Sequence, residues 1–203
     1  MRDSLVSVTL NAALGMCLLL LVGCATSPPA RHYVLTPLSD GKALTGDACA
    51  SVGIGPINLP EYANRTQVVT RATAEELLGS QFELWAEPLN ESVPRIIAAD
   101  LSRLFCTKEI VLYPWAASRA PDYRVEMEIV QIDGALGGTA TIEAWWRVTN
   151  GGDRKTKIAR KAVYQEATTG GDYKSLVLAH SRALVALSRD IAAALKQLGA
   201  PSE

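Results

Sequence analysis

The first 24 residues most constrain what this chain folds into, because they hold an apolar segment that ends at a cysteine. A short polar start with Arg2 leads into an apolar segment from about Val8 to Val22. A helix that crosses a bilayer needs about 20 apolar residues, and the uninterrupted part of this segment is shorter. This profile is typical of a secretory signal peptide rather than of a permanent membrane span.

The end of the apolar segment predicts a lipid anchor. Residues 21–24, Leu-Val-Gly-Cys, resemble the lipobox of bacterial lipoproteins, in which the cysteine thiol receives a diacylglyceryl group and the signal peptide is cleaved before it. The alternatives are an ordinary signal peptide that contains a cysteine, or a buried helix. We expect lipidation of Cys24, because the apolar segment, the motif and the following linker agree. Ala25 follows in place of Asp, which favours the outer membrane by the sorting rule of enteric lipoproteins.

The anchor divides the chain into three parts. Residues 1–23 are the predicted signal peptide, and residues 24–31 are the lipidated cysteine and a tether whose two prolines hold it extended. The six residues 25–30 reach about 20 Å at roughly 3.3 Å per residue, so the protein stays close to its membrane. Residues 32–203 are predicted to form a single domain, because neither a linker nor an internal repeat divides them.

Composition and motifs argue against several classes of function. The chain has 20 Lys and Arg against 21 Asp and Glu, whereas a nucleic-acid-binding protein needs a basic surface. Neither a dinucleotide-binding fingerprint nor a phosphate-binding GxxxxGK[ST] loop is found. Two histidines leave little for a metal site, and the flanks of Cys106 and His180 resemble no nucleophile motif. We therefore expect no enzymatic activity, no metal, no nucleic-acid partner and no cofactor beyond the covalent lipid.

Hydrophobic periodicity predicts both strands and helices in the mature chain. Residues 123–132 and 139–148 alternate in polarity around a Gly-rich turn, which predicts a hairpin. A third strand over about 155–166 completes a meander. Apolar residues at helical spacing predict a first helix with Asn90 or Ser92 as its N-cap, which places Pro94 in the first turn.

A second, longer helix closes the chain. Its apolar stripe is formed by Leu176, His180, Leu184, Leu187, Ile191, Leu195 and Leu198. His180 is interpreted as a core histidine whose hydrogen bonds are satisfied. The predicted fold class is α/β, with two main amphipathic helices packed on a mixed, largely antiparallel sheet, and α+β is the alternative.

Several segments, in the right order along the chain, together resemble the PqiC (YmbA-type) family of lipoproteins. They are Tyr33-Val34-Leu35, residues 55–62 (GPINLPEY) with Arg65 and Gln67-Val68-Val69, residues 84–89 (LWAEPL), Tyr113-Pro114-Trp115, Ala144-Trp145-Trp146 and the closing helix. The resemblance covers nearly the whole mature chain. The pair Cys49 and Cys106 departs from the family pattern.

The resemblance implies a non-catalytic auxiliary or docking subunit of an ABC-type or MCE-protein system that moves lipid between the two membranes and supports envelope integrity. The implied partner is a periplasm-spanning MCE-domain protein, and a ring of identical subunits is expected because MCE partners are themselves rings. One alternative is a structural or cell-wall-associated lipoprotein without a transport partner. A periplasmic hydrolase is a third hypothesis, disfavoured because no catalytic site is found.

Of the four cysteines, Cys17 lies inside the predicted signal peptide, so two remain once lipidation accounts for Cys24. In an oxidising periplasm Cys49 and Cys106 are expected to form a disulfide between the start of a strand and the end of the first helix. The alternative is a pair of small buried thiols.

Three residues are candidates for docking a partner protein. Tyr62 and Arg65 are of types favoured at interfaces, although the same loop also fits a rigid connection whose tyrosine packs on the core. Trp145 falls on the polar face of its strand, where it is either covered by a helix or exposed for an interface.

A cluster of five cations has two interpretations. One is a solvated edge strand whose charges prevent aggregation. The other is attraction to anionic lipid headgroups or to an acidic partner surface. The residues are Arg154, Lys155, Lys157, Arg160 and Lys161.

Overall fold

The structure is a computed structural model that describes residues 27–40, 42–116 and 120–199. The predicted signal peptide and Cys24, the predicted lipidation site, lie outside the described residues. The elements, in chain order, are β1 (Arg31–Tyr33), β2 (Thr45–Asn58), the 3-10 helix η1 (Glu61–Ala63), β3 (Gln67–Arg71), β4 (Leu77–Trp85), α2 (Leu89–Leu104), β5 (Thr107–Leu112), β6 (Tyr123–Gly134), β7 (Thr139–Asn150), β8 (Thr156–Ala167) and α3 (Tyr173–Leu198).

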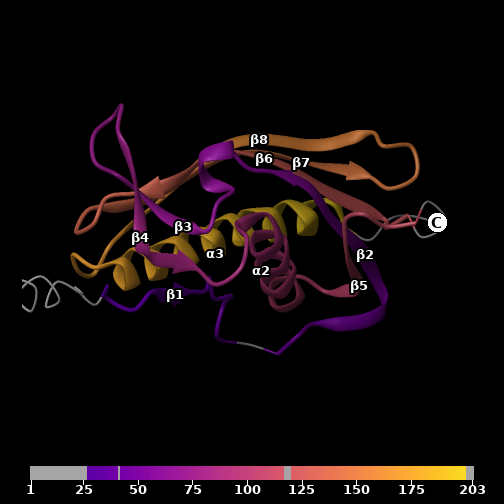
Figure 1. The fold of residues 1–203 in the computed structure, drawn as a ribbon. Helices are drawn as coiled ribbons and strands as arrows, with labels where there is room; N and C mark the ends of the chain where they lie inside the picture. Colours follow the sequence, from indigo (N-terminus) through magenta and orange to yellow (C-terminus); the bar gives the residue numbers. More distant parts are fainter. Residues whose placement is uncertain (1–26, 41, 117–119, 200–203) are drawn as a thin grey trace, which may run out of the picture.

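The described strands form two sheets, and the two long helices pack against the larger sheet and against each other (Figure 1). The larger sheet has the order β5-β2-β6-β7-β8, with β2 parallel to both of its neighbours and the last three strands antiparallel. The smaller sheet has the order β1-β4-β3. The predicted α/β class, with two helices on mixed and mostly antiparallel strands, is confirmed. The division into two sheets was not predicted.

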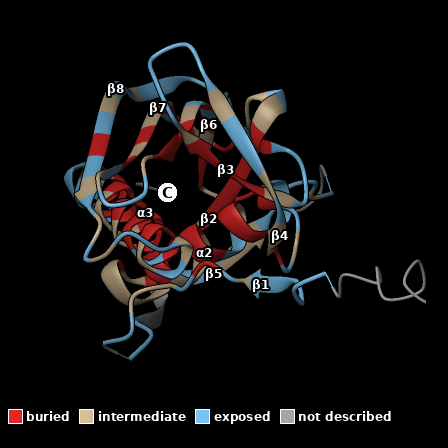
Figure 2. Ribbon diagram, turned by 60° about the vertical axis from the view of Figure 1, so that its left-hand side comes forward, coloured by how far each residue is buried: buried red, intermediate tan, exposed pale blue. Residues whose placement is uncertain are grey.

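The predicted meander is present as β6, β7 and β8. The turn between β6 and β7 is closed by the Ala135 N–H, which donates to the Thr139 carbonyl over 3.2 Å, and Gly137 has φ 71°. Only glycine adopts this conformation readily, which explains why a Gly-rich sequence joins the two strands. β8 lies at the edge of the sheet and is largely exposed (Figure 2), in agreement with its cation-rich sequence.

The helix α3 packs its predicted apolar stripe against β6, β7 and β8. The side chain of Asp172 accepts a hydrogen bond from the Ser175 N–H over 2.8 Å and so caps the first turn. Gly199, with φ 72°, ends the helix. The opposite face of the sheet is covered by neither of the described long helices (Figure 1).

The predicted N-cap of the first helix is wrong. The helix α2 begins at Leu89 after Pro88, and Ser92 is buried inside it rather than capping it. Leu89 is only 2% exposed. Burial of this residue therefore starts the helix before Asn90 and Ser92, the polar residues that were expected to cap it. Pro94 consequently lies beyond the first turn, where its missing N–H leaves the Asn90 carbonyl without its helical donor.

A disulfide joins Cys49 on β2 to Cys106, between α2 and β5, with the two Cα atoms 5.6 Å apart. The bond connects residues 57 positions apart and fixes the end of α2 to the central part of the larger sheet. On the chain-entropy model, closing a loop of this length restricts mainly the unfolded chain.

Replacing Cys106 by Ser is expected to lower the free energy of unfolding by about 4 kcal/mol, because the unfolded chain regains the entropy of the open loop. Urea denaturation checks this value, and the mass shift after alkylation with and without reduction shows whether the bond forms. If the wild-type protein and the variant unfold at the same urea concentration in oxidising buffer, the bond contributes nothing.

Candidate functional site

The uncovered face of the larger sheet presents an exposed tryptophan in the middle of β7. Trp145 on β7 lies opposite Glu128 on β6 and Lys161 on β8, and its side chain is 55% exposed. The Lys161 Nζ lies 5.5 Å from the indole centroid and 2.8 Å from a carboxylate oxygen of Glu143. The charges around Trp145 are therefore largely paired, and the indole is the main apolar group that remains available to a partner.

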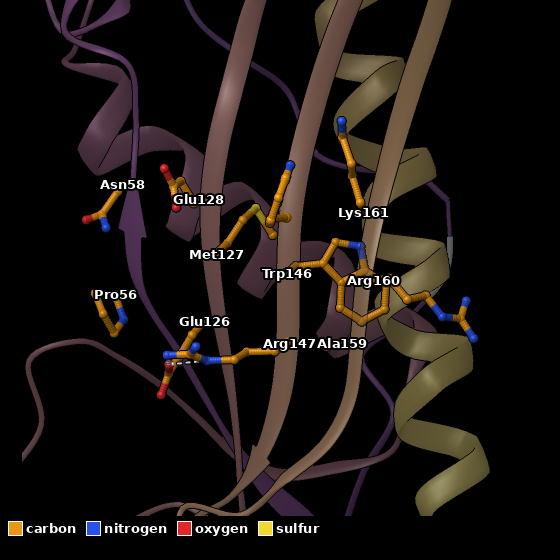
Figure 3. A pocket seen from close by; sticks show the side chains of 11 residues that line it. Pro56, Asn58, Glu126, Met127, Glu128, Trp146, Arg147, Ala159, Arg160 and Lys161 are labelled. Atoms are coloured by element: carbon orange, nitrogen blue, oxygen red, sulfur yellow. Dashed lines mark hydrogen bonds and ion pairs between the residues drawn. The ribbon is translucent and has the colours of Figure 1, made fainter.

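A groove of about 450 Å³ runs across β2, β6, β7 and β8 beside this tryptophan (Figure 3). An ion pair between Arg147 and Glu126, with the Arg147 Nε 2.8 Å from the carboxylate, crosses from β7 to β6 along it. The groove combines apolar and paired charged groups, as protein interfaces do. Its lining residues are Pro56, Asn58, Glu126, Met127, Glu128, Trp145, Trp146, Arg147, Ala159, Arg160 and Lys161.

A second pocket, of about 820 Å³, adjoins the groove and shares Pro56, Glu126 and Arg147 with it. Its aromatic wall is formed by Tyr113 and Trp115, whose rings meet edge to face with centroids 5.5 Å apart. Gly53 and Gly55 on β2 make room for these two side chains. A Cβ at Gly53 would lie 2.9 Å from the Trp115 ring, and one at Gly55 would lie 2.8 Å from the Tyr113 Cβ.

The five predicted cations do not form one surface. Lys161 faces Trp145, whereas Arg160 lies over the ring of Trp146 on the helix-covered face, because neighbouring residues of a strand point to opposite sides. Lys157 shares the side of Lys161 by the same alternation. Arg154 and Lys155 precede β8, and Arg154 lines the second pocket.

Tyr62 points into the protein rather than toward a partner. Its hydroxyl donates to the Asp133 carboxylate over 2.8 Å and accepts the Ile132 N–H over 3.1 Å. This geometry favours the predicted alternative of a rigid, packed connection. Arg65 is exposed. Of the three predicted docking residues, the structure therefore leaves Trp145 and Arg65 accessible and does not bring them together with Tyr62.

A network around Asp133, which was not predicted from the sequence, links the two sheets. The Arg71 guanidinium on β3 donates from Nε and Nη2 to the two oxygens of Asp133 on β6, each over 2.7 Å, and Gln131 donates over 2.9 Å. Burial alone would raise the pKa of Asp133, but these hydrogen bonds, that of Tyr62 and the charge of Arg71 together lower it. Burial also raises the pKa of Tyr62 to about 12. The sequence shows that an acidic residue, Asp133, stands at the end of a strand, which could have indicated a polar contact. Its partner Arg71 lies 62 residues away, so no local pattern connects the two.

The prediction that His180 is a core histidine is correct in its burial and wrong in its hydrogen bonding. The side chain is buried on α3, and its Nδ1 has no partner within the described residues. Burial lowers the pKa of His180 to about 4, although the nearby negative charge of Asp133 opposes this shift. The imidazole is therefore neutral at the pH of most compartments.

The described residues form neither a metal site nor a membrane-spanning helix. Within residues 27–199, apart from the undescribed positions, no group of three or more His, Cys, Asp or Glu side chains is placed to share a metal ion. None of the helices in the described part of the chain is long and apolar enough to cross a membrane.

Acidification is expected to destabilise the protein through His180. The folded pKa lies below the ordinary value of 6.5, so the stability is complete above pH 6.5 and falls as the pH drops toward 4. At pH 5 this group alone lowers the free energy of unfolding by about 2 kcal/mol relative to pH 7. Urea denaturation at both pH values measures the loss.

The variant His180→Leu provides the control, because leucine fills a similar volume and does not titrate. Its free energy of unfolding is expected to change less between pH 7 and pH 5, by about the 2 kcal/mol assigned to the histidine. An equal change in variant and wild type would show that His180 does not titrate as described.

Comparison with known proteins agrees with this architecture. The sequence matches the family described as ABC-type transport auxiliary lipoprotein component over residues 33–192. The fold resembles the crystal structure of an uncharacterized protein, with a TM-score of 0.67 and 16% identity over 82% of this chain and 98% of the other. It also resembles a Xanthomonas campestris protein of the family DUF330, with a TM-score of 0.61 and 13% identity over 80% and 92% of the two chains. No protein of curated function matches the chain.

The family match spans well over half of the chain, from the end of β1 to the second half of α3. It includes the segments that resemble PqiC-type lipoproteins, and it confirms that resemblance. The two solved structures share the fold at low identity. This chain therefore belongs to the ABC-type transport auxiliary lipoprotein family.

Proposed function

We propose that this protein is a non-catalytic docking subunit at the outer membrane, which holds a periplasm-spanning MCE-domain protein of an intermembrane lipid transport system. Family membership supports a transport-auxiliary role. The observation that carries the docking proposal is Trp145, exposed in the middle of β7 on a sheet face that none of the described long helices covers.

The chemistry around Trp145 suits a protein partner. Tryptophan and arginine dominate the binding energy of many interfaces, where a central anchor is surrounded by polar groups. Val163 is 53% exposed and lies opposite Glu143, next to Trp145 on the same face, which extends the apolar centre. The ion pair of Arg147 and Glu126 supplies a polar border. A partner that covers Trp145 therefore gains apolar contact without leaving these charges unpaired.

The predicted anchor places this docking face near a membrane. A tether of six residues reaches about 20 Å, so a partner rooted in the opposite membrane has to cross the periplasm to meet it. An MCE protein rooted in the inner membrane meets this requirement. We include a ring of identical subunits in the proposal, since a ring matches the symmetry of such a partner.

The absence of catalysis is part of the same proposal. A hydrolase needs an accessible acid, base or nucleophile, and neither Asp133 nor His180 is accessible. The Asp133 carboxylate accepts hydrogen bonds from three side chains, and His180 is buried. These observations support a role in binding rather than in bond cleavage.

Replacing Trp145 by Ala is expected to weaken capture of the MCE-domain protein by about 30-fold, as for a central interface tryptophan worth about 2 kcal/mol. Affinity capture in mild detergent, followed by titration of the purified partner, measures the effect. The matched control is Leu78→Ala, which removes a side chain that is 50% exposed on β4. Capture that is equally strong in both variants would remove Trp145 from the interface. If the wild-type protein captures no MCE protein, the alternative of a structural lipoprotein without a transport partner is favoured.

Replacing Cys24 by Ala is expected to release the protein from membranes, because the acyl chains provide its attachment. The matched control is Cys17→Ala, which changes a cysteine inside the predicted signal peptide and leaves the attachment intact. Fractionation of inner and outer membranes measures both variants. Retention of the Cys24→Ala variant in the membrane fraction would contradict the lipid anchor.

A further inference from the structure

The second pocket contains a buried arginine that no acidic side chain neutralises within the described residues. Arg124 on β6 is only 9% exposed and forms no ion pair there. Burying a charge is costly unless it is paired and hydrogen-bonded. An arginine kept in such a place is a candidate for binding an external anion.

The contacts of Arg124 satisfy only part of its guanidinium. Its Nη2 donates to the Gly151 carbonyl over 2.7 Å, and its Cζ lies 5.7 Å from the centroid of the Trp115 ring. Its Nε has no acceptor in the described structure. Thr149 lies directly opposite on β7, and its buried hydroxyl also has no partner there. Two neighbouring polar side chains are thus left with unused hydrogen-bonding capacity at one place.

The pocket around these groups has an excess of positive charge. Arg124, Arg147 and Arg154 line it together with a single acid, Glu126, which is already paired with Arg147. The remaining two arginines face a volume of about 820 Å³ that is also bounded by Tyr113 and Trp115. This volume is larger than the volume of a small inorganic ion. The aromatic wall offers an apolar surface to the molecule that bears the anionic group.

We infer that this pocket binds a phosphate group, carried by a lipid headgroup or present as a free phosphate. A phosphate accepts several hydrogen bonds at once, and the planar guanidinium of arginine matches its oxygens. Arg124 and Thr149 supply hydrogen-bond donors to the phosphate inside the pocket. Arg154, just before β8, supplies a second positive charge. The inference does not depend on the docking of a partner at Trp145.

Isothermal titration calorimetry with the mature, acylated protein in an uncharged detergent tests the inference. The probes are inorganic phosphate, dihexanoyl phosphatidylglycerol below its micellar concentration, and acetate as a carboxylate control. Saturable binding of inorganic phosphate supports the pocket with a free phosphate as its ligand. Binding of phosphatidylglycerol alone supports it with a lipid headgroup. The inference is overturned if neither phosphate probe binds, or if acetate binds as tightly as they do.

Three variants locate the binding. Arg124→Gln, Thr149→Val and Arg154→Ala are each expected to weaken the binding of the phosphate probe, by about tenfold or more for the two arginines. The control Arg31→Ala removes an arginine on β1 whose side chain is 72% exposed and is expected to bind as the wild type does. Thermal melts establish that each variant is folded, and the exposed Arg154 keeps the test valid if Arg124→Gln does not fold. Unchanged affinity in both Arg154→Ala and Thr149→Val would overturn the assignment.

Discussion

One-sided burial of the meander against α3 is the constraint on which the rest of the structure depends. Alternate residues of β7, from Ala140 to Val148, are almost fully buried under the helix, so the residues between them must face the other way. A shift of one residue in the pairing of β7 would exchange the two sets. The position of Trp145 on an uncovered face, and of Arg124 and Thr149 opposite each other beside it, follows from this register.

The two sheets are held together by interactions of a different kind. The Asp133 carboxylate on β6 accepts hydrogen bonds from two nitrogens of the Arg71 guanidinium on β3. It also accepts a hydrogen bond from the Tyr62 hydroxyl, which follows β2. Because the Asp133 carboxylate is fully buried, removing Arg71 would leave a buried charge without compensation. The disulfide of Cys49 and Cys106 fixes the N-terminal part of β2 to the end of α2. The Asp133 network therefore fixes the position of the smaller sheet relative to the larger one, and the disulfide fixes α2 relative to β2. Apolar contacts, which are not directional, specify these positions less strictly.

Periodic segments could be predicted from the sequence because their pattern is local. The hairpin of β6 and β7, the third strand and the stripe of α3 depend on residues a few positions apart. The start of α2 was missed because burial of Leu89 outweighs the capping preference of Asn90 and Ser92. The network around Asp133 and the surroundings of Arg124 were missed for a related reason. Their partners lie tens of residues away, and a single sequence does not show which distant residues meet.

The uncovered face carries two sites with opposite chemistry at neighbouring positions. Around Trp145 the charges are paired with one another, so the face offers apolar contact. Arg124 and Arg154 lack acidic partners in the described structure, so the same face offers a place for an anion. Arg147 and Glu126 line both the groove and the pocket, and their ion pair separates the two environments. The register of β6 and β7 therefore provides a surface for protein contact at Trp145 and, farther along the same strands, a pocket for a phosphate group.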